Sequence, residues 1–222
     1  MKAFWKRTNR GLWLGLVLLV VLLTVIIVGQ VRFGREKPKI RQLAKNYITD
    51  LLEVNAAVGD AVGGQPMTDA QKQTQSDALE AVIRQYWYEG KIDRSSGYFT
   101  SYNAVQLREK LSQWQADAPV ILTDLRMQID SRSVSVKADG PGRAIVIVYA
   151  GDITATLQGK EPVDGALTLF PINLDGKFGS SVGEWRVSGS AIFGLELARR
   201  NGKWRVVGMS SSVGYGYGGL DE

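Results

Sequence analysis

The sequence predicts an α+β protein, in which an N-terminal transmembrane helix is followed by helices packed on one face of a curved antiparallel sheet. Three observations support this class. Residues 11–31 contain no charged side chain. Apolar residues then recur at three- and four-residue steps as far as residue 116, which is the period of amphipathic helices. Beyond Pro119 the apolar period shortens to two, as in strands with one solvated face.

The uncharged run is predicted to be an uncleaved membrane anchor. Residues 11–31 are 21 in number, enough helix to cross a hydrocarbon core of about 30 Å. A cleaved signal peptide is the alternative, but its apolar region would be only about 7–15 residues long, and Ile27-Val28-Gly29 is a poor cleavage site. Both flanks are basic, so charge does not fix the orientation. We expect a cytoplasmic N-terminus, because the lead segment has only ten residues, and an extracytoplasmic domain at the inner or plasma membrane.

The net charge of +5 is distributed unevenly. Residues 1–45 contain ten Lys and Arg and one acid, so they carry +9 and the remaining 177 residues carry −4. Anionic lipids attract basic side chains beside a bilayer, which makes the lipid bilayer an expected partner. An acidic remainder predicts no nucleic acid partner. The predicted membrane-interface anchors are Trp5, Trp13, Arg32, Arg35 and Lys37.

The chain contains no Cys and no His. Disulfides, thiolate nucleophiles and iron–sulfur clusters are therefore excluded, and so are the usual zinc ligand sets and Ser-His-Asp catalysis. We expect no catalytic residue, no cofactor and no metal site. This composition suits an extracytoplasmic bacterial domain that dispenses with disulfides.

Three helices are predicted before the sheet. A basic N-terminal segment (1–10) and the anchor (11–31) lead into a juxtamembrane segment with an amphipathic helix (32–66) that ends at the GGQP turn of residues 63–66. Thr68 and Gln71 form a capping box for the second helix, which ends at Gly90. The third helix spans about 103–116. The side chains expected to face the core are Ile40, Leu43, Tyr47, Ile48, Leu51, Val54, Leu79, Val82, Ile83, Tyr86, Trp87, Val105, Leu107, Leu111 and Trp114.

The strands follow from period and turns. Leu125, Met127 and Ile129 alternate with polar residues in a first strand, with which residues 133–138 are expected to pair. Residues 143–157 start as a continuous apolar run, typical of a central strand. A strand at 166–172, a glycine-rich loop at 173–183, and strands at 184–200 and 203–211 complete the sheet.

Asn201-Gly202 predicts a two-residue hairpin turn of type I′. This turn places Leu197 opposite Val206 and Arg199 opposite Trp204, with Arg200 and Lys203 as a like-charge pair beside the turn. The inner face of the sheet is expected to take Leu195, Leu197, Trp204 and Val206.

A family resemblance rests on three segments, DALEAVIRQYWYEGKID (77–93), NAVQLREKLSQW (103–114) and LELARRNGKWRVVGM (195–209). Their order resembles the nuclear-transport-factor-2-like (NTF2-like, cone-shaped α+β) superfamily, over a domain predicted at 67–212. A single anchor followed by this domain is similar to the VirB8-like inner-membrane components of type IV secretion and conjugation machines. That resemblance implies a scaffold that dimerises or trimerises and contacts other envelope proteins.

Two motif matches carry no chemistry. Residues 214–219 satisfy G-x-G-x-x-G, but only three residues follow, so no helix presents amides to a phosphate. Residues 213–222 are expected to form a flexible Gly/Tyr tail, with a short partner-contact segment as the alternative. Residues 173–176 lack the later ligands of a calcium loop.

The aromatic residues leave two functions open. Tyr86, Trp87, Trp114 and Trp204 are either core residues or the lining of a hydrophobic pocket, in which an isomerase would place a carboxylate opposite a tyrosine. The leading hypothesis is a non-enzymatic membrane protein whose domain assembles with itself or with other envelope proteins. The alternative is a membrane-tethered pocket domain that binds or transforms a small apolar ligand.

Overall fold

The computed structural model describes residues 10–56, 67–90, 102–116, 121–158, 166–175, 177–181 and 184–213. Trp5, the turn at 63–66 and the tail after residue 213 lie outside this part of the chain. Contacts divide the chain into two compact units, Met1–Lys39 and Ile40–Glu222. The boundaries predicted from the sequence at residues 31, 66 and 212 remain predictions.

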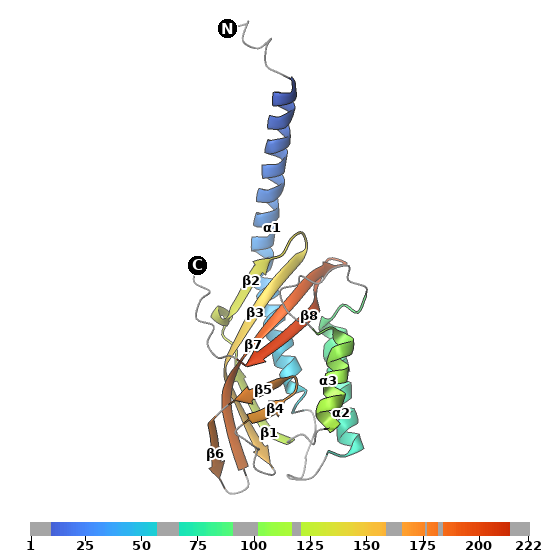
Figure 1. Cartoon of the computed structure of the whole chain (residues 1–222), viewed down its shortest axis with the longest axis vertical. Coiled ribbons are helices and arrows are strands. Elements are labelled where there is room, and N and C mark those ends of the chain that lie inside the picture. The colour runs from blue at the N-terminus through green and yellow to red at the C-terminus, as the bar shows by residue number, and fades with distance from the viewer. Residues whose placement is uncertain are drawn as a thin grey trace. The chain divides into compact units, whose positions relative to one another are not determined.

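The element order confirms an α+β fold with an antiparallel sheet (Figure 1). The helices are α1 (Arg10–Glu53), α2 (Asp69–Tyr86) and α3 (Ala104–Ala116), with a short 3₁₀ turn η1 (Ser131–Ser133). The strands are β1 (Ile121–Gln128), β2 (Val134–Ala138), β3 (Arg143–Gln158), β4 (Ala166–Leu169), β5 (Ile172–Asp175), β6 (Lys177–Ser181), β7 (Glu184–Arg200) and β8 (Lys203–Val213).

The first unit contributes the apolar part of α1. Its apolar side chains from Leu12 to Val31 are all exposed. Among the described helices, this one is long and apolar enough to cross a membrane by length and composition. The helix continues through Pro38, so the predicted transmembrane and amphipathic segments form one helix.

The second unit begins with the last turns of α1, which are buried in its core. Ile40, Tyr47, Ile48 and Leu51 are fully buried, as the apolar period predicts. The capping box of α2 is also confirmed, because Thr68 Oγ1 accepts from the Gln71 amide and Gln71 Oε1 accepts from the Thr68 amide. The helix ends at Tyr86, four residues before the predicted Gly90. Val105, expected in the core, is 58% exposed on α3.

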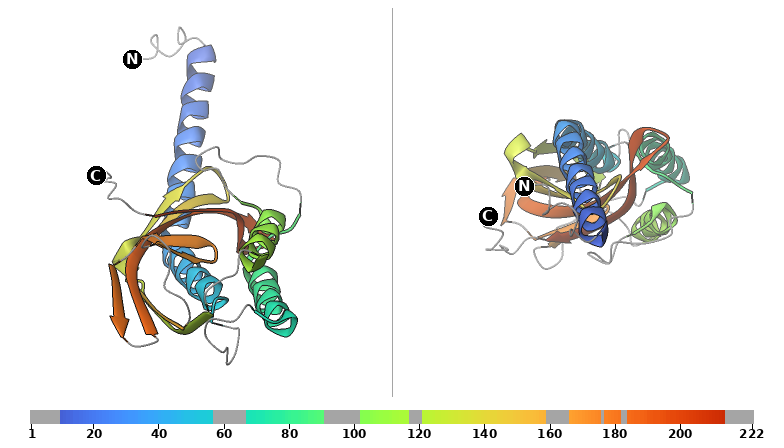
Figure 2. Two further views of the ribbon diagram at one scale, coloured as in Figure 1. Left: turned by 60° about the horizontal axis from the view of Figure 1, so that its bottom comes forward. Right: turned by 90° about the horizontal axis from the view of Figure 1, so that it is seen from above.

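The long strands β3 and β7 form the centre of the main sheet. In one half of the sheet the strand order is β1-β3-β7-β6. In the other half β2 pairs with β3 and β8 pairs with β7 (Figure 2). Residues 134–138 therefore pair with β3 and not with the first strand, which corrects the prediction. The reason is local: Asp130 Oδ1 accepts from the Arg132 amide and caps η1, so that β1 and β2 pair with successive parts of β3.

The expected glycine-rich loop at 173–183 is also wrong for most of its length. Residues 172–175 form β5, which pairs with β4, and residues 177–181 form β6, which pairs with β7. Backbone pairing to neighbouring strands here overrides the weak strand propensity of the sequence.

The β7–β8 hairpin has the predicted register. Leu197 lies opposite Val206, Arg199 opposite Trp204 and Arg200 opposite Lys203. Asn201 has φ of 50° and Gly202 has φ of 79°, the left-handed pair that a type I′ turn requires. Leu195, Leu197 and Val206 are buried on the inner face, and Trp204 is half-buried.

Candidate interaction surface

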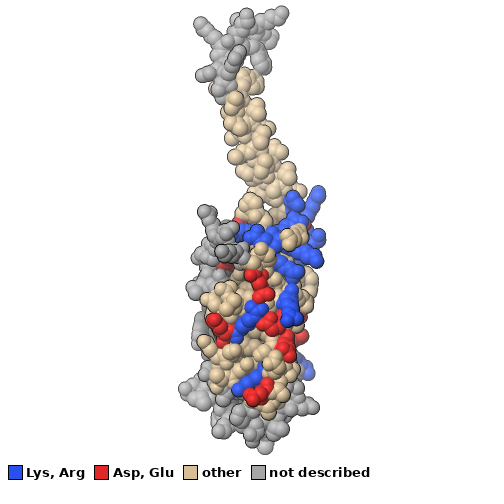
Figure 3. Space-filling model, turned by 90° about the vertical axis from the view of Figure 1, so that its right-hand side faces the viewer, with Lys and Arg blue, Asp and Glu red and all other residues tan. Residues whose placement is uncertain are grey.

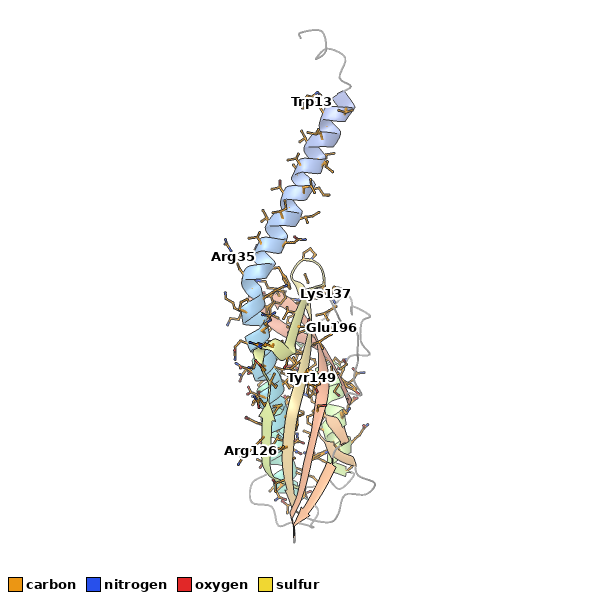
Figure 4. The ribbon with its side chains drawn as sticks, turned by 90° about the vertical axis from the view of Figure 1, so that its left-hand side faces the viewer. Trp13, Arg35, Arg126, Lys137, Tyr149 and Glu196 are labelled. Atoms are coloured by element: carbon orange, nitrogen blue, oxygen red, sulfur yellow. The ribbon has the colours of Figure 1, made fainter. Side chains whose placement is uncertain are left out.

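The main sheet has two faces with different surroundings. The inner face, which includes Leu195 and Met209, is covered by α1, where Tyr47 Oη donates to Met209 Sδ at 3.0 Å. The outer face carries the alternate residues of the same strands, and Figure 4 shows Tyr149, Glu196 and Lys137 on it. Tyr149, 44% exposed, is one of two large apolar side chains outside α1 that are exposed among the described residues.

Strand register arranges the outer face in rows that run from the hairpin tips toward the middle of the sheet. The first two rows are mostly basic, the third has one basic and one acidic side chain, and the last two are apolar or small. In order they are Arg200–Lys203, Arg143–Ala198–Arg205, Lys137–Ile145–Glu196–Gly208, Ser135–Ile147–Gly194–Ser210 and Tyr149–Ile192.

Tyr149 is held in place by the strand itself. A β-bulge between Ala150 and Ile153 shifts the register of β3 against β7, and Gly151 lies in it. A Cβ built on Gly151 would approach the Tyr149 ring to 3.2 Å. The glycine therefore makes room for the ring, while half-buried Ile147 and Ile192 extend the apolar area on the same face.

Glu196 is the one buried charged residue in the described part of the chain, with 4% of its surface exposed. Arg143 lies beside it, with Nη2 at 3.9 Å from Glu196 Oε2 and Nε at 3.6 Å from Asp139 Oδ2. Buried charged groups in proteins are usually paired, and Arg143 is such a partner for Glu196. This pairing fixes Arg143 at the β2–β3 hairpin.

Two of the predicted aromatic site residues, Tyr86 and Trp87, meet in the core beneath the inner face. The Tyr47 ring contacts Tyr86 and Trp87 edge-on, at centroid distances of 5.5 and 6.1 Å. Trp87 Nε1 donates to Tyr47 Oη at 3.2 Å. Burial raises the pKa of Tyr47, so its hydroxyl stays protonated and bridges Trp87 to Met209.

Tyr86 also faces a carboxylate. Its hydroxyl donates to Asp50 Oδ2 at 2.5 Å, which joins α2 to the last turn of α1. Burial and then this hydrogen bond raise the pKa of Tyr86, so its hydroxyl stays protonated and acts as a hydrogen-bond donor.

The remaining predicted site residues that the structure describes lie on α3, on β8 and along α1. Trp114 is buried on α3, and Trp204 is half-buried beside the β7–β8 turn. Among the predicted interface anchors, Trp13 is 43% exposed on α1. Arg32 and Arg35 are exposed, and Lys37 is half-buried with its Nζ 5.8 Å from the Phe33 ring centroid.

The helices carry a second charged cluster, centred on Arg108. Its Nε and Nη2 donate to Glu80 at 2.5 and 2.9 Å, and Nη2 lies 2.8 Å from Glu89. These bonds lower the pKa of Glu80. The arrangement joins α3 to α2 and uses the charges structurally. Within the described residues, no group of three or more metal-ligating side chains gathers.

The fold and this surface define an α+β protein with one helix suited to a membrane and an outer sheet face on which Tyr149 is exposed. No family model matches the chain, and no curated protein matches it either. Among solved structures, it is similar to the intermembrane-space region of the chloroplast protein ARC6, at 13% identity and a TM-score of 0.38. That match covers 78% of this chain and 96% of the other.

Sequence reasoning missed the residues of the outer face. Tyr149 stands in a continuous apolar run, which gives no sign that its side is open. Glu196 and Arg143 are 53 positions apart in the sequence, and only the pairing of β3 with β7 brings them together. The available signal for this face was the alternation of apolar and polar residues late in the strand at 184–200, where Glu196 lies between Leu195 and Leu197.

Proposed function

We propose that this chain is a non-enzymatic, single-pass membrane protein whose α+β unit mediates protein–protein assembly through the outer face of its sheet. The observation that carries the proposal is the exposed Tyr149, set among half-buried isoleucines. Tyrosine offers a large contact area and a polar tip at low entropic cost, and it is enriched where proteins meet.

The chemistry of the described residues supports a binding role. The charged pairs Arg108–Glu80 and Arg143–Glu196 hold elements together. The expected partners are a second copy of the chain and other envelope proteins. The resemblance to VirB8-like components is the reason to include secretion and conjugation scaffolds in this proposal, with the N-terminus cytoplasmic and the unit outside.

Site-specific photo-crosslinking in intact membranes tests the proposal. A benzophenone amino acid replaces Tyr149 and, as the matched control, Val105, which is also apolar and exposed but lies on α3. We expect discrete crosslinked products from position 149 only. A band at twice the chain mass indicates self-association, and other bands name envelope partners. No product from position 149, or the same products from both positions, contradicts the proposal.

The Tyr86–Asp50 contact favours one alternative function. A tyrosine hydroxyl opposite a carboxylate is the arrangement expected of a pocket that binds or transforms a small apolar ligand. Native mass spectrometry of gently extracted protein tests this role. A bound small molecule that is lost in Tyr86→Phe and retained in Tyr149→Phe would support it. A ligand-free spectrum for all three proteins would exclude it.

A further inference from the structure

We propose that the tips of the β2–β3 and β7–β8 hairpins bind anionic phospholipid headgroups, which gives the α+β unit a second contact with the bilayer. The inference rests on the anchor of the proposed function and adds a lipid-binding surface on the folded unit. The surface, called the basic tip below, consists of Lys137, Arg143, Arg199, Arg200, Lys203 and Arg205.

Charge is concentrated at this end of the unit. The basic tip has six positive side chains, and the acids among them are Asp139 and Glu196. The unit as a whole, residues 40–222, has 19 basic and 21 acidic residues, so the rest of it is clearly negative. Figure 3 shows that Lys and Arg gather in one region of the surface of the chain and that acidic residues lie mainly outside it.

The basic side chains are available to a surface. Lys137, Arg200 and Lys203 are exposed, and Arg143, Arg199 and Arg205 are half-buried. Two of the guanidinium groups contact other parts of the unit: that of Arg200 lies 5.4 Å from the Tyr88 ring centroid, and that of Arg205 donates to the Gln85 carbonyl. The turn residues beside them, Pro141 and Asn201, are exposed as well.

The two hairpins form one surface because they are bonded to each other. The Arg199 amide donates to the Gly142 carbonyl at 2.7 Å, and Arg143 pairs with Ala198 in the register of β3 and β7. The Asp139 amide donates to the Arg143 carbonyl at 3.1 Å and closes the β2–β3 turn. A flat membrane would thus meet both turns together.

The position of Ile40 identifies the bilayer as the occupant. Within the second unit, α1 runs in the same direction as β8. Near the end of the helix, Asn55 donates to the Phe170 carbonyl, and the next residue, Pro171, accepts from Ser211 of β8. Earlier in the helix, Tyr47 donates to Met209, which is also earlier in β8. The start of the unit, Ile40, therefore lies toward the beginning of β8, at the hairpin end.

Chain length then limits the distance to the membrane. Nine residue-to-residue steps lead from Val31, the end of the predicted span, to Ile40. They cover about 14 Å as a helix and at most about 32 Å when extended. The basic tip is thus tethered within reach of the headgroups, whose negative surface potential attracts Lys and Arg over about a Debye length. An acidic protein is the other chemistry that could occupy a basic surface.

Fluorescence quenching on the full-length chain tests the inference. The chain has no Cys, so Pro141→Cys adds a single labelling site on the exposed β2–β3 turn. The labelled chain is reconstituted into vesicles of phosphatidylcholine alone, or of phosphatidylcholine with phosphatidylglycerol, each carrying a headgroup-linked quencher. We expect stronger quenching with phosphatidylglycerol, and loss of the difference at high salt.

A matched pair of double variants separates this surface from general charge. Arg200→Gln with Lys203→Gln removes two charges from the basic tip. Lys72→Gln with Arg126→Gln removes two from elsewhere, since Lys72 lies in the first turn of α2 and Arg126 on the half of β1 that pairs with residues 152–158. The first pair should lower the ratio of α+β units bound to the bilayer surface to units released from it, on the order of 25-fold. The control pair should leave it within about twofold, because its charges lie beyond a Debye length of about 8 Å.

The outcomes are distinguishable. One outcome is a chain that stays with the vesicles after an alkaline wash but shows the same quenching in both lipids, or quenching that Arg200→Gln with Lys203→Gln does not change. This outcome overturns the inference and leaves the anchor supported. A chain that is washed off overturns the anchor and this inference together. The circular dichroism spectrum of each variant is compared with that of the unsubstituted chain. Matching spectra show that neither result comes from unfolding of the variant.

Discussion

Individual polar groups hold the core of the second unit together. Tyr47 Oη accepts from Trp87 and donates to Met209, and the Asn55 side chain accepts from the Phe170 amide while donating to the Phe170 and Leu52 carbonyls. All of these groups are buried. Because a buried polar group without a partner is costly, each of them fixes the position of two elements at once.

Tyr47→Phe is expected to destabilise the unit by about 1–3 kcal/mol, because it leaves Trp87 Nε1 buried without its acceptor. Urea unfolding of the detergent-solubilised chain, followed by tryptophan fluorescence, measures the change. Tyr149→Phe removes the same atom from an exposed ring and should change stability by no more than about 0.5 kcal/mol. Equal losses in the two variants would mean that the buried hydroxyl contributes nothing specific.

The Glu80–Arg108 pair predicts a pH dependence. Hydrogen bonds from Arg108 lower the pKa of Glu80 in the folded state. The pair therefore stabilises the fold fully above the unfolded pKa of about 4.3, and this contribution is lost as the pH falls through the lower folded value. Glu80→Gln should lower the unfolding midpoint at pH 7, with a difference that shrinks below about pH 4. Glu109→Gln, on the exposed side of α3, is the control; a Glu80→Gln deficit that persists at low pH would contradict this account.

Turns and caps decide where elements begin and end. Thr68 and Gln71 start α2, and Asn201 and Gly202 reverse the chain between β7 and β8. Each relies on one or two side chains whose local conformational preference matches the backbone, so each is visible in the sequence.

Gly202→Ala should destabilise the hairpin by about 1–2 kcal/mol. A Cβ at this position meets no atom within 4 Å, so the whole cost comes from the backbone at φ of 79°. Gly202→Asn should cost clearly less, because Asn tolerates the left-handed region. The same urea titration compares the two variants, and an equal loss for both would contradict the backbone explanation.

The sequence predicted elements better than their partners. The helix faces of α1 and α2 and the register of β7 on β8 follow from local period and turn chemistry, and the structure confirms them. The pairing of β2, the strands β5 and β6, and the exposure of Val105 depend on which distant segment lies alongside, which local pattern does not encode. For the same reason Tyr86 was a predicted site residue, while its partner Asp50 was not.

At the scale of the whole molecule, one helix takes part in two environments. Its first part exposes apolar side chains on all sides, and its last turns are core. Exposing the first part to water is unfavourable, because burying each of its apolar side chains in an apolar environment is worth about 1.5–3 kcal/mol. This contrast is the physical basis for the proposed anchor.

Val21→Arg with Leu22→Arg should abolish stable insertion, because each arginine at the centre of a span costs about 2.5–3.5 kcal/mol. Val21→Ala with Leu22→Ala keeps the span uncharged and should insert normally. The fraction of chain that resists carbonate extraction measures both. An arginine variant that is retained as well as the alanine variant would show that residues 11–31 do not form the anchor.

The bond between Tyr47 and Met209 also sets an order in time, because it closes over 162 residues. At a synthesis rate of 5–20 residues per second, the ribosome needs roughly 8 to 32 s to make the second residue after the first. During that interval the core side of the helix waits without its last strand. Strand β8 follows the other strands of the main sheet in the chain, so the outer face is incomplete, and can capture no partner as a whole, until residue 213 has been made.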